Sequence, residues 1–235
     1  MVPHQPQPSS RAPEPGVCVG VVVFPGSNDD RDLMGALELL GARVEPIWHK
    51  DTRLPDGVRG VGIPGGFSYG DYLRCGAMAR FSPVMAAVVA HARAGGPTLG
   101  ICNGFQILCE SGLLPGALVR NRDLRFVCDE VKVRAEETGQ FRDPGTAGML
   151  LLPIKHGEGA YVPDPARPPR VAFRYSEANP NGTTDGIAGV LNEAGNVLGL
   201  MPHPEHAVDP KLSCGTDGAA ILRGFLGAAA RWGKA

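Results

Sequence analysis

Two short segments far apart in the chain carry residue types that together can cleave an amide. Cys102 lies in a Gly-Ile-Cys-Asn-Gly segment, where an apolar run over 98–101 gives way to a helical pattern. His203 and Glu205 stand two residues apart near the end of the chain, and prolines on both sides of the histidine fix the local backbone. Acyl transfer from an amide requires a nucleophile, a base and a group that orients the base. The sequence therefore predicts an enzyme with Cys102, His203 and Glu205 as its catalytic residues.

The neighbours of Cys102 favour a sharp strand-to-helix turn, like a nucleophile elbow. Gly100 and Gly104 remove the side chains that would obstruct such a turn, and the helix N-terminus behind it favours the thiolate. Core packing is the alternative for any single cysteine, and we assign it to Cys109 on the same helix. His206 has no clear partner in the sequence, which favours a solvated surface histidine.

A glycine-rich turn over 64–71 follows an apolar run and supplies the third element of the expected site. Its backbone N–H groups would lie at the carboxyl edge of a parallel sheet, where such sheets bind ligands. The amides of Gly65, Gly66 and Phe67, together with that of Asn103, are the predicted oxyanion hole. An ordinary strand-to-loop turn is the alternative interpretation of this segment.

The elements that must position these residues alternate between strands and helices. Ser27, Asn28 and Asp29 offer a cap for a helix with apolar residues at helical spacing, which ends at Gly41. The alternation favours an α/β fold: an open, mostly parallel, flavodoxin-like sheet with helices on both faces. Short runs in the second half predict antiparallel additions, and residues 1–15 predict a disordered tail before one domain over 16–235. The expected strands are 17–24, 43–48, 60–63, 98–101 and 195–201, the additions 119–133, 149–155, 170–175 and 186–191, and the helices 82–93, 103–112 and 219–229.

Bulk composition indicates a soluble enzyme. The apolar fraction of 43% can build a core, and no apolar run is long enough to span a bilayer. A net charge of −1 provides no field to attract nucleic acid or an anionic membrane. The six cysteines follow no secretory signal pattern, so we expect reduced thiols in the cytoplasm.

Three other sites are excluded by their missing parts. The His203-Pro204-Glu205 segment matches the H-x-E of zinc deaminases, but the P-C-x-x-C that must follow is absent from the sequence. The sequence contains no C-x-x-C pair of the kind that binds structural zinc, and we predict no metal site. A G-x-G-x-x-G match over 60–65 lies within an expected strand, and no phosphate loop occurs, so the chain has no predicted ATP site of its own.

The cysteine, Pro-Gly-Gly and His-Pro-Glu motifs resemble the class I glutamine amidotransferase family. Longer matches narrow this resemblance to glutaminase subunits that serve a separate synthetase of purine biosynthesis. One departure is Asp29, where the family often has cysteine. The matching segments are 24–28, 64–74, 100–106, 156–159, 179–182 and 198–205.

The resemblance implies a reaction and its partners. Cys102 would attack the side-chain amide of glutamine, giving a glutamyl thioester and ammonia, and Gln106 would help to hold the backbone charges of glutamine. A helix-surface position is the alternative for Gln106. The ammonia would pass to a large synthetase subunit that uses Mg-ATP to convert formylglycinamide ribonucleotide to the amidine. A small bridging subunit is a further expected partner, and no cofactor is expected in this chain.

One loop and three alternatives stay open at the level of sequence. His156 and Glu158 lie in an expected irregular region and have no chemical role in the sequence interpretation; we hypothesise that their loop contacts the synthetase or the glutamine pocket. The surface around 68–74 is a second hypothesised contact. The alternatives for the chain are an amidotransferase for another acceptor, a stand-alone cysteine hydrolase and a binding module without catalysis.

Overall fold

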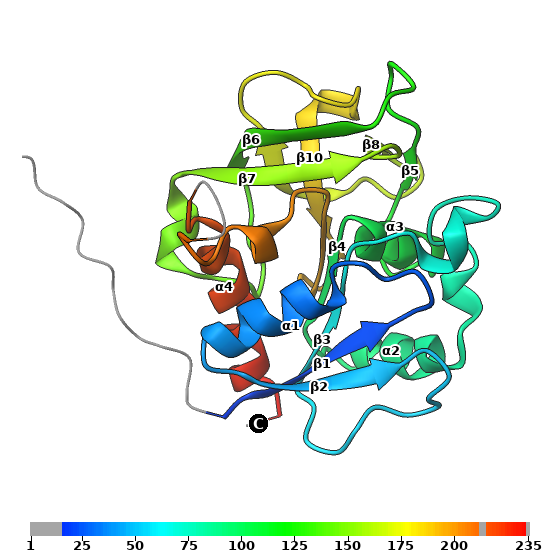
Figure 1. Cartoon of the computed structure of the whole chain (residues 1–235), viewed down its shortest axis with the longest axis vertical. Coiled ribbons are helices and arrows are strands. Elements are labelled where there is room, and N and C mark those ends of the chain that lie inside the picture. Colours follow the sequence, from blue (N-terminus) through cyan, green and yellow to red (C-terminus); the bar gives the residue numbers. More distant parts are fainter. Residues whose placement is uncertain (1–15, 212–214, 234–235) are drawn as a thin grey trace, which may run out of the picture.

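A nine-stranded mixed sheet runs through the part of the chain that the computed structural model describes, residues 16–211 and 215–233. Its strand order is β2-β1-β3-β4-β11-β10-β9-β6-β7, and the helices lie against it (Figure 1). The tail predicted over 1–15 lies outside the described residues, as does Cys214. The five other cysteines are free thiols.

One half of the sheet is parallel and matches the expected strands closely. Its members pair in the order β2-β1-β3-β4-β11, and the chain moves outward in both directions from β1. This is the flavodoxin-like order, whose ligands bind where the carboxyl ends of the strands meet. The fold-class prediction is therefore confirmed. The strands are β1 (Cys18–Val23), β2 (Arg43–Trp48), β3 (Gly60–Ile63), β4 (Thr98–Ile101) and β11 (Val197–Leu200).

The other half of the sheet is antiparallel, as the second half of the sequence predicts. Pairing runs from β11 through β10, β9 and β6 to the edge strand β7. A separate two-stranded sheet joins β5 to β8. The strands are β5 (Ala117–Val119), β6 (Val127–Ala135), β7 (Met149–His156), β8 (Ala160–Val162), β9 (Arg170–Tyr175) and β10 (Ile187–Leu191).

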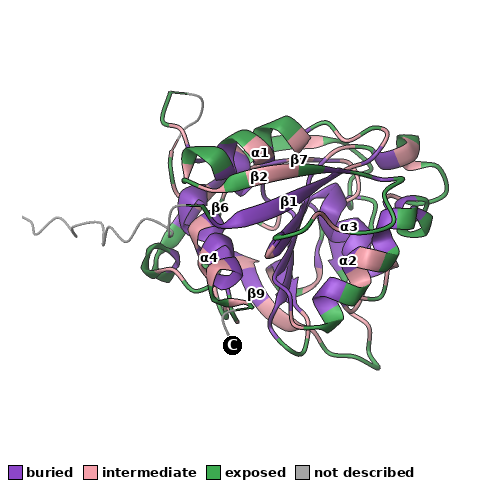
Figure 2. Cartoon of the chain, turned by 90° about the horizontal axis from the view of Figure 1, so that it is seen from below, coloured by how far each residue is buried: buried purple, intermediate pink, exposed green. Residues whose placement is uncertain are grey.

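The helices cover both faces of the parallel half. Helices α1 (Asp30–Leu39) and α4 (Gly218–Arg231) lie on one face, and α2 (Pro83–Arg93) and α3 (Asn103–Glu110) lie on the other (Figure 2). Glycines in the strands permit this close approach, since a Cβ at Gly60 would press on Phe225 of α4. None of the described helices is long and apolar enough to cross a membrane.

The packing of α3 against β3 makes a prediction about Gly104. A Cβ at this position would overlap the backbone oxygen of Ile63, which cannot move without disturbing the sheet. We expect Gly104→Ala to lower the free energy of unfolding by about 1–3 kcal/mol and to shift the turn that presents Cys102. Denaturant unfolding measures the first effect and glutamine turnover the second.

Gly35→Ala is the matched control for this substitution. Gly35 lies within α1, and nothing stands within 4 Å of where its Cβ would be. Helix propensity alone then predicts a gain of about 1 kcal/mol. Equal unfolding midpoints for the two variants would contradict the close packing of α3 on β3.

Candidate active site

Cys102 occupies the turn between β4 and α3, at the carboxyl edge of the parallel strands. Its φ of 50° and ψ of −105° lie in a region that non-glycine residues rarely adopt, so the turn holds the cysteine in a strained conformation. The thiol is buried and lies 3.8 Å from the backbone oxygen of Lys155. The predicted elbow is therefore confirmed.

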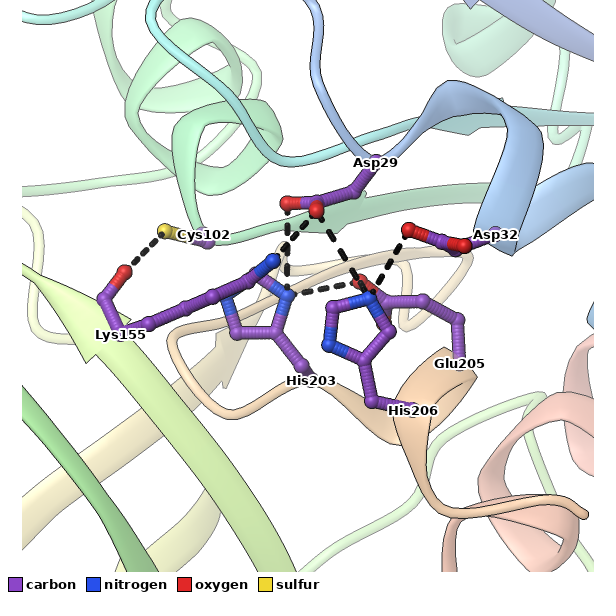
Figure 3. A network of polar contacts seen from close by, with 7 residues as sticks. All are labelled: Asp29, Asp32, Cys102, Lys155, His203, Glu205 and His206. Carbon is purple, nitrogen blue, oxygen red and sulfur yellow. Dashed lines mark hydrogen bonds and ion pairs between the residues drawn. The ribbon is translucent and has the colours of Figure 1, made fainter. Parts of the chain in front are cut away.

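His203 and Glu205 follow β11 at a short turn of 3₁₀ helix, η5 (Pro204–His206). The Nδ1 atom of His203 lies 2.7 Å from Oε1 of Glu205, and both side chains are buried. The backbone of His203 is held as well, because its N–H donates to the oxygen of Pro153 at 2.8 Å. Figure 3 shows the Cys102 sulfur on the side of the ring away from Glu205, where Nε2 has no hydrogen-bond partner among the described residues.

The charge state of His203 follows from its surroundings. Burial alone lowers the pKa of His203, but the negative charges of Glu205 and Cys102 outweigh burial and raise the pKa to about 10. The imidazole is therefore protonated at neutral pH when a thiolate lies beside it. This arrangement provides a nucleophile and a proton donor together.

A pocket of about 350 Å³ opens at Cys102. Its wall combines the turn after β1, the glycine-rich turn after β3, the start of α3 and the loop after β7. Carboxylates, amides and one lysine line it, so it offers groups of both charges to a zwitterionic ligand. The lining residues are Asn28, Asp29, Gly66, Phe67, Asp71, Cys75, Cys102, Gln106, Phe126, Lys155, His156, Gly157 and Glu158.

The structure narrows the predicted oxyanion hole. Phe67 cannot serve through its amide, because that N–H donates to the oxygen of Gly26 at 2.8 Å. Gly65 also has a steric role, because a Cβ there would overlap the Asp29 carboxylate and lie 2.8 Å from Cε1 of His203. Gly66 lines the pocket, and Asn103 is the first residue of α3, where a helix leaves its N–H groups without intrahelical partners. The oxyanion role remains a proposal for the amides of Gly65, Gly66 and Asn103.

Gln106 is buried, so the surface alternative is wrong. Its Nε2 donates to the backbone oxygen of Glu158 at 2.6 Å, and its Oε1 accepts from Nδ2 of Asn103 at 2.8 Å. Oδ1 of Asn103 in turn accepts from the N–H of Ser68 at 3.2 Å. The two side chains thus tie α3 to the loop after β7 and to the glycine-rich turn. A contact between Gln106 and the substrate remains a proposal.

His156 is the last residue of β7. The sequence predicted an irregular region here, and that prediction is wrong for His156. Its Nδ1 lies 3.1 Å from Oδ1 of Asn121, whose Nδ2 donates to the backbone oxygen of His156 at 2.8 Å. Burial, and then the charge of His203, lowers the pKa of His156 to about 4. The ring is therefore neutral and supports the loop over 157–159, which forms one wall of the pocket.

Asn121 provides a test of this wall. Asn121→Ala would leave the N–H of Gly159, which donates to Oδ1 at 3.0 Å, and the oxygen of His156 buried without their partner. Each lost partner costs about 1–3 kcal/mol, so we expect a clear loss of stability and a raised KM for glutamine. Urea unfolding and steady-state kinetics measure both. An unchanged KM would mean that the wall does not depend on Asn121.

Two further titratable residues, Asp29 and His206, lie beside His203, and their contacts with it were not expected from the sequence. Asp29 occupies the N-cap position of α1, in agreement with the sequence, but its side chain makes no capping hydrogen bond and its carboxylate is ion-paired with Nζ of Lys155. His206 is partly exposed, but it does have partners: its ring stacks on His203 with centroids 5.1 Å apart, and its Nε2 lies 3.2 Å from Asp32. In the sequence, the only indication of the role of Asp29 is its position after the carboxyl end of β1.

Two groups within this cluster have the spacing of metal ligands. They are His203, Glu205 and His206, and Asp29, Asp32 and His206, with the atoms of each group within 4.8 Å of one another. A metal at the first group would compete for Nδ1 of His203, which already contacts Glu205. The second group shares Asp29 with Lys155. We therefore assign these atoms to charge balance around the imidazole.

Comparison with known proteins shows to which class of enzyme the chain belongs. A family model for the CobB/CobQ-like glutamine amidotransferase domain matches residues 16–213. The flavodoxin-like sheet with a thiol at its carboxyl edge agrees with that class. A putative GMP synthase subunit from Thermoplasma acidophilum shares the fold, with a TM-score of 0.64 at 17% identity over 90% of this chain and 94% of that chain. The chain is a glutamine amidotransferase.

Closer relatives give the particular family. A phosphoribosylformylglycinamidine synthase subunit PurQ from Trichormus variabilis is 54% identical over 218 residues, 88% of this chain and 96% of the relative. Another from Rubrobacter xylanophilus is 54% identical over 222 residues, 90% and 98% of the two chains. The solved structure of PurLQS from Thermotoga maritima matches with a TM-score of 0.82 and 42% identity, over 90% of this chain and 97% of that chain. The chain belongs to the PurQ family of phosphoribosylformylglycinamidine synthase subunits, which confirms the resemblance seen in the sequence.

Proposed function

We propose that this chain releases ammonia from glutamine through Cys102, His203 and Glu205. The Cys102 thiolate attacks the side-chain amide carbon, and the imidazolium of His203 gives its Nε2 proton to the departing ammonia. The product of this half-reaction is a glutamyl thioester. Water, deprotonated by the now neutral His203, then attacks the thioester, which releases glutamate and regenerates the Cys102 thiolate beside the His203 imidazolium. Glu205 accepts a hydrogen bond from Nδ1–H throughout and stabilises the charged ring.

Backbone amides would stabilise the charge that develops on the carbonyl oxygen. Gly66 of the glycine-rich turn lines the same pocket as Cys102, and Asn103 directly follows Cys102 as the first residue of α3. Donors placed in advance, away from water, are worth several kcal/mol in such reactions. The pocket lining beyond them, Gln106 included, would hold the amino and carboxylate groups of glutamine.

The ammonia would be used by a partner. We propose a large synthetase subunit that consumes Mg-ATP and a small bridging subunit, because the Thermotoga maritima neighbour is described as PurLQS. We also propose that the reaction in this chain needs no cofactor of its own and takes place in the cytoplasm. The exposed Tyr72 and Leu73, beside the pocket residue Asp71, fit the hypothesised partner contact around 68–74.

This proposal rests on one observation: in a PurQ-family chain, the buried His203–Glu205 pair lies beside Cys102, whose backbone is strained. The test is glutamate release from glutamine by the chain alone, and then with synthetase, bridging subunit, formylglycinamide ribonucleotide and Mg-ATP. We expect release to rise sharply when all components are present. A rate of glutamate release that does not change when the partners and the acceptor are added would instead favour a stand-alone hydrolase or another acceptor.

A further inference from the structure

Asp29 is a buried carboxylate at the junction of four segments that build the active site. It ends the turn after β1, and its backbone N–H, like that of Asn28, donates to the oxygen of Gly65 at 3.2 Å. Its side chain lies over Gly65, where any Cβ would overlap it. The residue therefore joins the start of α1 to the glycine-rich turn and reaches toward β7 and η5.

The carboxylate of Asp29 contacts both a cation and the catalytic imidazole (Figure 3). One oxygen is ion-paired with Nζ of Lys155, and the other lies 3.7 Å from Nδ1 of His203. The distance to Nδ1 is too long for a hydrogen bond, which Glu205 already makes, but it is short for two opposite charges away from water. His203 thus has two carboxylates on its Nδ1 side, and one of them is neutralised by a lysine.

Building on the proposed function, we propose that Asp29 and Lys155 form a positioning pair that sets how readily His203 holds its proton. The Asp29 charge stabilises the imidazolium that protonates the leaving ammonia. The Lys155 charge moderates this effect, so that the same ring can lose its proton and then accept one from water in the second half-reaction. The pair also ties β7, whose Lys155 oxygen lies 3.8 Å from Sγ of Cys102, to the elements around His203.

Several elements around His203 contribute titratable groups. The groups that face it are Glu205 and His206 of η5, Asp29 beside α1, Cys102 before α3, and Lys155 and His156 of β7. Asp32 acts at one remove, since it contacts Nε2 of His206 at 3.2 Å. Only Lys155 brings a permanent positive charge into this group, and its partner is Asp29. The two substitutions that break the pair should therefore act on His203 in opposite directions.

The test is the protonation midpoint of His203, measured by NMR on histidine-labelled full-length chain. The Cys102→Ala background removes the thiolate charge, and loss of one signal in His203→Asn assigns the resonance. We expect Asp29→Asn to lower the midpoint by about one pH unit or more and Lys155→Met to raise it. Asp32→Asn is the matched control, an exposed acid-to-amide change that reaches His203 only through His206 and should therefore shift the midpoint much less than Asp29→Asn.

The same pair should appear in catalysis by the complete complex. In otherwise wild-type chain, the alkaline limb of kcat/KM for glutamate release should move to lower pH in Asp29→Asn and to higher pH in Lys155→Met. Absence of a shift in folded Asp29→Asn, or shifts of both variants in one direction, would overturn the proposal. If Asp29→Asn does not fold, an unmoved or lowered midpoint in Lys155→Met overturns it alone. Glutamate release that is absent from wild-type chain would refute the proposed function, whereas the NMR shifts test the pair independently.

Discussion

Replacing Cys102 by alanine is expected to abolish glutamine-dependent synthesis in the complete complex while synthesis from added ammonium salt continues. In the proposed mechanism this sulfur forms the thioester. Cys75 also lines the pocket, but burial and the neighbouring carboxylates of Asp71 and Glu158 raise the pKa of its thiol, so it is a poor nucleophile. Loss of the nucleophile from a triad lowers kcat by about 10⁴-fold or more. Product formation from the two nitrogen sources, measured side by side, separates loss of ammonia production from loss of assembly.

Cys109→Ala is the control for this experiment. Cys109 lies on the same helix, but it packs in the core with its sulfur 3.8 Å from the oxygen of Pro115. We expect a modest loss of stability and nearly unchanged glutamine turnover. Glutamine-dependent product from Cys102→Ala at the wild-type rate would remove the nucleophile from the proposed mechanism.

The second large effect is expected from Glu205→Gln. Glutamine keeps the shape of the side chain but can donate to Nδ1, which favours the wrong tautomer of His203, and it removes the main charge that holds the proton. We expect kcat to fall by about 10²–10⁴-fold. Steady-state glutaminase kinetics in the complex measure this loss.

The pH dependence of the same variant follows from the raised pKa of His203. In the wild-type chain the imidazolium persists below that pKa, about 10, and is lost as the pH rises through it. The stability that this ring contributes is therefore complete below its unfolded value of about 6.5 and declines from there to the folded value. Without Glu205 the alkaline limb of activity should move toward neutral pH. An unmoved limb would mean that Glu205 does not set the charge of His203.

The strained turn at Cys102 and the His203–Glu205 contact could be predicted from sequence because each depends on residues that are close together in the chain. Cys102 stands among the glycines that a strained turn requires, and His203 precedes its carboxylate by only two residues. The parallel half of the sheet could also be predicted from sequence, because strands buried on both faces form continuous apolar runs.

Contacts between distant segments explain what the sequence did not reveal. Lys155 and Asp29 meet across 126 positions, so neither charge identifies its partner in the chain. The amide of Phe67 was assigned wrongly because an antiparallel bridge between Ser27 and Gly66 occupies it. Gln106 looked like a possible surface residue because the loop that buries it comes from the end of β7.

The most direct test of covalent catalysis is to look for the glutamyl thioester on Cys102. The complete complex would be mixed with glutamine, quenched in acid within one turnover, digested and examined by mass spectrometry. We predict a glutamyl adduct on the peptide that contains Cys102, and its disappearance when hydroxylamine is added after the quench. Glutamate formation at the full rate, with that peptide unmodified at every quench time, would contradict covalent catalysis by Cys102.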